Sequence, residues 1–98
     1  MRLIFHPESL AELTGAAQFY QSRVQGLGLE FLAAVDASLA RIAAAPQLNR
    51  VHRFGARRLM VERFPYSIYY VILPDHIQIL SFPHHSRRPG YWRNRIKD

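Results

Sequence analysis

The stretch RRLMVERFPYSIYYVILPDHIQILSF, residues 57–82, decides the fold, because its pattern predicts three consecutive strands joined by short turns. Residues 57–63 alternate between two faces, which is typical of a strand with one face available to solvent or a ligand. Residues 67–73 are almost continuously apolar and rich in β-branched and aromatic side chains, so we expect the central, most buried strand there. Residues 77–82 predict the third strand.

Two helices are expected before these strands, because apolar side chains recur there at helical spacing. The first stripe consists of Leu10, Leu13, Ala17, Tyr20 and Val24, and the second of Leu32, Val35, Leu39 and Ile42. Between them, Gly26-Leu27-Gly28 interrupts the pattern with two flexible residues. Pro46 disfavours a helical residue before it, so the second helix should end near Ala44 or Ala45. The two helices should form a hairpin.

A short apolar run at residues 2–6 predicts one further strand before Pro7, which is well placed in the first turn of a helix. The predicted order is therefore β-α-α-β-β-β. This order predicts an α+β fold in which the helical hairpin packs on one face of a small, mostly antiparallel sheet.

Length and composition limit the classes of protein to consider. The chain has 98 residues, of which 49% are hydrophobic and 20% charged, so we expect a single globular domain over residues 1–98. With no cysteine, disulfides and thiolate sites are excluded, and the cytoplasm is the expected location. The longest apolar run, at residues 68–73, is far shorter than the roughly 20 residues that span a bilayer, so no membrane association is expected.

Positive charge is concentrated in the second half of the chain. Residues 1–49 hold three basic and four acidic side chains, whereas residues 50–98 hold ten basic and three acidic ones. The second half therefore carries all of the excess behind the net charge of +6. All but one of the basic residues are arginine, which favours bidentate contacts with phosphate or carboxylate. The partner should therefore be an anion: nucleic acid, the ribosome or an acidic protein segment.

The densest polar cluster is PHHSRRPGYWR, residues 83–93, at the start of a basic C-terminal tail expected over residues 83–98. Its imidazoles could exchange protons, its guanidiniums could neutralise a phosphate, and Tyr91 and Trp92 could stack on bases. These are the groups that a metal-free ribonuclease needs. The alternative is a tail that binds a partner protein, with Tyr91 and Trp92 as an aromatic clasp that packs the tail on the core.

The two adjacent histidines of this cluster are not equivalent if the chain stays extended beyond the last strand. His84 and His85 would then point to opposite faces, so at most one could enter a given pocket. We favour His85, which would share a face with Ser81. The pair lacks an i, i+4 partner and a nearby carboxylate, so no metal site is expected. Glycine-rich phosphate loops are absent as well, and no cofactor is expected.

A second basic group lies upstream, on the loop and the first strand of the predicted sheet. It consists of Arg50, Arg53, Arg57, Arg58 and Arg63. Antiparallel pairing would bring Arg58 and Arg63 within reach of residues after the third strand, depending on the register. Alternatively, the group is a solvated charged edge that deters aggregation.

Four segments together resemble the RelE/ParE superfamily, the toxins of bacterial type II toxin-antitoxin modules. They are HPESLAELTGAAQFY (6–20), LARIAAAPQ (39–47), RFPYSIYYVI (63–72) and PHHSRRPGYW (83–92). The resemblance covers nearly the whole chain. It implies a small toxin held inactive by a co-encoded antitoxin, whose acidic or amphipathic C-terminal segment wraps the toxin and often covers the basic surface.

The superfamily divides into two mechanisms, and the HHSRRPGYW ending resembles ParE-like and plasmid stabilisation proteins. ParE-like members inhibit DNA gyrase, so the resemblance implies growth inhibition through binding to gyrase. The residues expected to bind the target are Arg58, Arg87, Arg88, Tyr91, Trp92 and Arg93.

The alternative is the RelE-like mechanism, metal-independent cleavage of mRNA on the ribosome. It would use His85 for proton transfer, Arg63 and Arg87 as phosphate clamps, and Tyr91 for positioning or as a second proton carrier. Two departures count against it: Ser67 stands where that branch carries an arginine, and Lys97 is the only lysine. A third alternative is a chain that has lost toxicity and serves only as a partner-binding or DNA-associating module.

Overall fold

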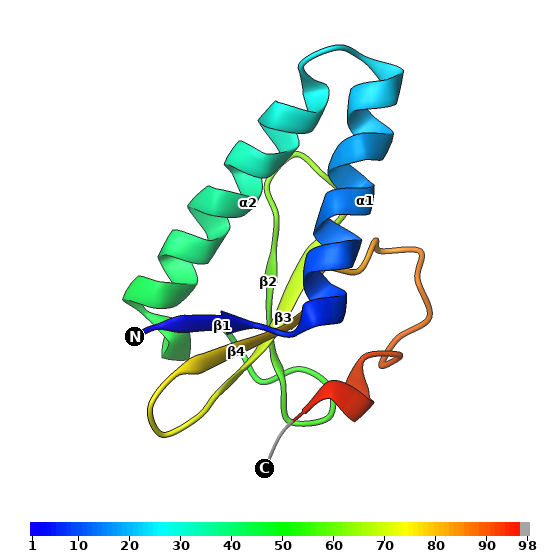
Figure 1. The fold of residues 1–98 in the computed structure, drawn as a ribbon. Helices are drawn as coiled ribbons and strands as arrows, with labels where there is room; N and C mark the ends of the chain where they lie inside the picture. The colour runs from blue at the N-terminus through cyan, green and yellow to red at the C-terminus, as the bar shows by residue number, and fades with distance from the viewer. Residues whose placement is uncertain (97–98) are drawn as a thin grey trace.

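The helices and strands of the computed structural model, which describes residues 1–96, follow the predicted order (Figure 1). They are β1 (Leu3–Phe5), α1 (Pro7–Arg23), α2 (Leu27–Ala44), β2 (Arg57–Met60), β3 (Ser67–Ile72) and β4 (Ile77–Ser81). Short 3₁₀ turns follow α2 at Pro46–Leu48 and lie in the tail at Arg93–Arg95. Of the basic tail expected over residues 83–98, Lys97 and Asp98 lie outside the described residues. No helix within residues 1–96 is both long and apolar enough to cross a membrane.

The four strands form one mixed sheet in the order β1-β4-β3-β2. β2 pairs antiparallel with β3, and β3 with β4, whereas β1 pairs parallel with β4. A parallel pair needs a long crossover connection. Between β1 and β4 that connection includes the α1–α2 hairpin. The α+β class and the mostly antiparallel sheet are confirmed.

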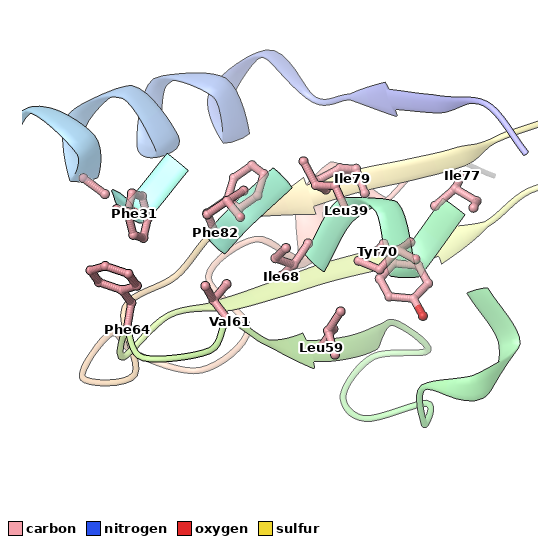
Figure 2. Packing of buried hydrophobic residues seen from close by; sticks show 13 residues of the cluster. Phe31, Leu39, Leu59, Val61, Phe64, Ile68, Tyr70, Ile77, Ile79 and Phe82 are labelled. Atoms are coloured by element: carbon pink, nitrogen blue, oxygen red, sulfur yellow. The ribbon is translucent and has the colours of Figure 1, made fainter. Parts of the chain in front are cut away.

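The helical hairpin covers one face of the sheet and forms the main core with it (Figure 2). Ile68 and Tyr70 of β3 lie in this core with Leu39 of α2, and the Phe31 ring of α2 packs against that of Phe64, 5.2 Å between centroids. The buried Tyr70 hydroxyl donates to the carbonyl of Pro46 at 2.6 Å, so its polar end is satisfied. The core therefore consists of alternate residues of the strands, as the period of a strand requires.

The C-terminal segment covers the opposite face of the same sheet. Tyr69 and Val71 of β3 and Leu80 of β4 are buried there against Trp92, whose ring centroid lies 4.4 Å from that of Tyr69. In Figure 1 the orange segment after β4 loops outward and returns, in red, beside the green loop that precedes β2. β3 is thus buried on both faces, which explains its continuous apolar sequence.

Two predictions about these elements were wrong, one about the end of a strand and one about the buried face of a helix. The strand expected over residues 57–63 ends at Met60, because the chain turns there: the Val61 amide donates to the carbonyl of Tyr66 and Arg63 adopts a φ of +73°. The inward stripe of α1 also differs. Val24 lies in extended backbone beyond the end of the helix, and Leu10 is exposed. The inward position in the first turn belongs instead to Ser9, which is fully buried and donates its hydroxyl to the carbonyl of His6.

The two glycines of the interhelical turn have different roles. Gly26 adopts a φ of +87° and makes the turn, whereas Gly28 already lies in the first turn of α2, contrary to the expectation that both interrupt the helices. A Cβ added to Gly28 would lie 2.6 Å from the carbonyl oxygen of Ala17. The side chain of Gln21 accepts hydrogen bonds from the amides of both glycines, at 3.1 and 3.2 Å. Gly28 therefore sets the close approach of α1 and α2.

Replacing Gly28 by alanine should destabilise the protein by about 1–3 kcal/mol, because backbone must move to admit the methyl group. Gly15 provides the matched control, since it lies inside α1 and an added Cβ meets nothing within 4 Å. Gly15→Ala should stabilise the protein by about 0.5–1 kcal/mol. Urea unfolding measures both changes, and two shifts of the same sign would contradict the assignment.

Candidate functional site

A pocket of about 240 Å³ opens on the sheet face that the helices leave uncovered, where β2, β3 and the C-terminal segment meet. Seven of the residues that line it are basic or imidazole side chains: His52, Arg53, Arg58, His84, His85, Arg87 and Arg88. None of the acidic residues within residues 1–96 lines it. We call it the cationic pocket.

The arginines of the cationic pocket have no acidic partner within residues 1–96. Elsewhere, Arg2 pairs with Asp75, Arg63 with Glu30 and Arg95 with Glu12. Within residues 1–96, no carboxylate lies within ion-pair distance of the four pocket arginines. Their positive charge is uncompensated and gathered in a concave site, which favours binding of an anion.

The loop before β2 forms one wall of the pocket through a tight turn at Phe54 and Gly55, which adopt φ values of 54° and 77°. The His52 amide donates to the carbonyl of Ala56 at 2.7 Å, and the Ala56 amide donates to that of Arg53 at 2.9 Å. These bonds close the turn and place His52 and Arg53 beside the pocket.

The opposite wall is formed by the chain after β4. Pairing with β3 continues past the strand end, because the Ser67 amide donates to the carbonyl of Pro83 and the His85 amide donates to that of Pro65. The chain then turns, and the Arg87 amide donates to the carbonyl of His84 at 2.9 Å. Both histidines line the pocket, but their rings have different neighbours: the His85 ring lies beside Ser67, whereas the His84 ring lies 5.1 Å from that of Tyr66, which packs against the main core.

The histidines have distinct partners. His85 Nε2 lies 3.0 Å from Ser67 Oγ. His84 Nδ1 accepts from the amide of Ser86 at 3.0 Å, which makes it an acceptor rather than a donor. His52 Nδ1 lies 3.4 Å from the Tyr69 hydroxyl.

The environment of His52 favours its neutral form. The main cause that lowers the pKa of His52 below its usual value is its partial removal from water. The positive charges of Arg58 and Arg53 lower this pKa further. The pocket therefore holds a neutral imidazole among fixed positive charges at neutral pH.

Tyr91 and Trp92 serve the attachment of the tail. The Tyr91 hydroxyl donates to Glu12 Oε2 at 2.9 Å, and burial, together with the neighbouring Glu12 carboxylate, raises the pKa of Tyr91 far above its usual range. It is therefore no proton carrier near neutral pH. Trp92 is 1% exposed, so its ring packs the tail on the sheet, as the clasp alternative states, and is not free to stack on a base.

The structure brings together some of the predicted site residues and separates others. Arg58, Arg87 and Arg88 line the cationic pocket with His85. Arg63 does not, because its Nη2 bonds Glu30 Oε1 at 3.0 Å, on the side of α2. The proposed catalytic set of His85, Arg63, Arg87 and Tyr91 is therefore not assembled in this pocket.

Arg93 is also outside the pocket lining, since its Nη1 donates to the carbonyl of Gly90 at 3.2 Å and its guanidinium lies 5.6 Å from the centroid of the Phe54 ring. His52, in contrast, lines the pocket although the sequence did not single it out. The Phe-Gly turn that follows it is the local signal that could have placed it there. Within residues 1–96 no group of three His, Cys, Asp or Glu side chains is arranged to hold a metal ion.

Comparisons with known proteins agree with this fold. A family model described as "ParE toxin of type II toxin-antitoxin system, parDE" matches residues 3–89. No curated protein matches the chain. Among solved structures, a chain of the chromosomal ParDE TA system from P. aeruginosa is 21% identical, with a TM-score of 0.75, and the match covers 86% of this chain and 95% of that one. This likeness shows a shared fold.

Proposed function

The chain belongs to the ParE toxin family of type II toxin-antitoxin systems, and on that basis we propose that it arrests bacterial growth by binding DNA gyrase through its cationic pocket. The observation that carries this proposal is the gathering of four arginines without acidic partners in one concave site. Their charge is available to a partner, because no carboxylate within residues 1–96 neutralises it.

The geometry favours binding over catalysis. General acid–base catalysis uses side chains placed within hydrogen-bond reach of the protons that they transfer. The Tyr91 hydroxyl is held by Glu12, and Arg63 is held by Glu30. His85 remains in the pocket together with the arginines, which suit recognition of a charged surface.

A co-encoded antitoxin fits the surface beside the cationic pocket. A broad, shallow groove of about 810 Å³ runs along the edge strand β2 and shares His52, Arg58 and Met60 with the pocket. Leu48 and Met60 are exposed along it, and Arg41 and Arg50 also line it. An acidic, amphipathic segment laid in this groove would cover the pocket rim, which accounts for neutralisation.

The proposal predicts that the purified protein inhibits DNA supercoiling by gyrase and that its antitoxin restores it. Arg58→Gln/Arg87→Gln, which removes two pocket charges, should lose most of the inhibition, whereas Arg2→Gln/Arg23→Gln, which removes the same charge from exposed sites outside the pocket, should retain it. A supercoiling assay over a range of toxin concentrations measures this. Undiminished supercoiling at saturating toxin would exclude gyrase as the target.

A second candidate is cleavage of mRNA on the ribosome, favoured by one observation: His85 lies with Arg58 and Arg87 in a single pocket. A translation extract given the toxin should then contain cut mRNA. Full cutting by His85→Ala would exclude His85 as the proton-transfer group. Uncut mRNA, together with gyrase inhibition, would decide for the first candidate.

A further inference from the structure

We propose that Phe54 is a positioning residue of the cationic pocket: its ring clasps the loop before β2 to the C-terminal segment and so holds the two walls of the pocket together. Phe54 does not line the pocket and would act through the cations on either side of it. This inference rests on the proposed function, because it concerns how the proposed binding site is held in shape.

The two walls are exposed segments of the chain. Residues 50–55 and 84–89 are all exposed, and they provide every basic or imidazole side chain of the pocket except Arg58, which lies on β2. The loop is closed by its own hydrogen bonds, and the tail is bonded to the sheet and to α1. Within residues 1–96, no hydrogen bond or ion pair joins the loop to the tail.

The charges of the two walls favour their separation. Arg53 lies on the loop, and Arg87 and Arg88 lie on the tail, with no carboxylate in the pocket between them. Like charges repel one another, and the repulsion is stronger where water is partly excluded. An apolar contact between the walls therefore has to hold the pocket in shape.

The Phe54 ring provides such a contact. Its centroid lies 6.0 Å from that of Trp92 at an interplanar angle of 85°, the edge-to-face arrangement that aromatic pairs favour. The ring also lies against the buried Gly90, so closely that a Cβ added to Gly90 would overlap it. Ala56 is buried in the same cluster as Trp92 and anchors the base of the loop, so the ring holds its tip.

The backbone of Phe54 supports a role for the ring. Its φ of 54° lies in the left-handed region, which is uncommon for residues other than glycine. Gly55 follows with a φ of 77°, and a turn with two such residues favours the pair Asn-Gly. Strained residues persist where surrounding contacts hold them, and they cluster at functional sites. Asparagine would make this turn with less strain, so the turn itself does not account for a phenylalanine.

Phe54→Asn, which suits the turn and removes the ring, tests the inference in the gyrase supercoiling assay. Half-inhibition should require about tenfold more protein or higher, because the partner must then order the loop and the tail as it binds. The urea midpoint should change little, since relief of strain offsets the loss of a half-exposed ring. Phe54→Tyr keeps the ring and should keep the inhibition.

Phe19→Gln is the matched control. Phe19 lies in α1, is 50% exposed compared with 54% for Phe54, and likewise has an arginine beside its ring, with the Arg23 guanidinium 4.8 Å from the centroid. It does not line the cationic pocket. This variant should inhibit gyrase as strongly as the unsubstituted chain.

Tryptophan fluorescence reports on the clasp without any partner, because Trp92 is the only tryptophan of the chain. Its ring is 1% exposed. Phe54→Asn should shift its emission to longer wavelength and increase its quenching by acrylamide. Phe54→Tyr and Phe19→Gln should leave both properties close to those of the unsubstituted chain.

Gly90→Ala tests the contact between the ring and the tail in a second way. In the unsubstituted chain the added methyl group must displace the Phe54 ring and also strains the backbone, since Gly90 has a φ of +76°. In Phe54→Asn only the backbone strain remains. Gly90→Ala should therefore lower the urea midpoint less in Phe54→Asn than in the unsubstituted chain, which is the coupling expected of residues in contact.

Any of three outcomes would overturn the inference: full inhibition by Phe54→Asn, unchanged Trp92 emission in that variant, or equal effects of Gly90→Ala in the two backgrounds. Failure of the unsubstituted chain to inhibit gyrase would instead exclude the proposed function. The fluorescence and unfolding measurements would then still decide whether Phe54 holds the walls together.

Discussion

Replacing Glu12 by alanine is expected to destabilise the protein by about 3–5 kcal/mol and to release the C-terminal segment from the sheet. Glu12 lies in α1 and Arg95 near the other end of the chain, yet their side chains are only 18% and 11% exposed and bond at 2.9 Å. Removing one partner of such a pair leaves the other charge poorly solvated, which is the costly case.

The Glu12 carboxylate joins three parts of the fold. Its Oε1 accepts from the Phe82 amide at the end of β4, at 3.0 Å. Its Oε2 accepts from the Tyr91 hydroxyl and from Arg95 Nη2, both at 2.9 Å. Arg95 Nη1 in turn donates to the carbonyl of Leu80 at 2.9 Å. Alanine would leave three donors without their acceptor.

Urea unfolding and limited trypsin digestion measure the two effects of Glu12→Ala. The midpoint should fall, and cleavage after arginines of the C-terminal segment should become rapid under native conditions. Glu8→Ala is the matched control, because Glu8 lies 3.7 Å from the same Arg95 nitrogen but is 69% exposed, and such exposed pairs contribute about 0–1 kcal/mol. Equal unfolding midpoints for the two variants would contradict the role given to Glu12.

Loss of the Glu12 carboxylate should also weaken binding by the cationic pocket, although Glu12 does not line the pocket. Arg87 rests on the Tyr91 ring, and Tyr91 is held by Glu12. Glu12 is therefore a positioning residue for the pocket.

The helices and strands could be predicted because each depends on a local pattern of side chains. The apolar run of β3 and the helical spacing of Val35, Leu39 and Ile42 are visible in short stretches of sequence, and all three of these side chains are buried in the main core. The inward residue of the first turn of α1 was misjudged for the same reason, since the pattern favoured Leu10 whereas the small, hydrogen-bonded Ser9 is the buried one.

The attachment of the tail could not be predicted, because it depends on pairs that are distant in sequence. Glu12 and Arg95 are separated by 83 positions, and neither carries a local signal that names the other. Trp92 showed the same ambiguity: a tryptophan in a basic tail can stack on a ligand or on the core, and only the position of Tyr69 decides.

The candidate site could be predicted only in part. The sequence pointed to Arg58, Arg87 and Arg88, which the fold does gather in one pocket. It also pointed to Arg63, but the turn after β2 directs that side chain to Glu30, 33 positions away. Such a turn depends on backbone conformation at a single residue, which composition does not reveal.

Loss of toxicity in the pocket variant is the largest functional effect expected. Arg58 and Arg87 have no carboxylate partner within residues 1–96, so their replacement by glutamine should leave folding intact. Two lost charge-assisted contacts weaken a complex about a hundredfold or more. A toxin present at ordinary cellular levels would then no longer occupy its target.

Colony formation by a bacterial host that expresses the chain without antitoxin tests the central claim most directly. We expect the unsubstituted chain and Arg2→Gln/Arg23→Gln to arrest growth, and Arg58→Gln/Arg87→Gln to allow normal colonies at equal protein levels. Arrest by the pocket variant as complete as by the unsubstituted chain would contradict the claim that toxicity acts through the cationic pocket. Normal growth with the unsubstituted chain would contradict toxicity itself and leave a partner-binding module.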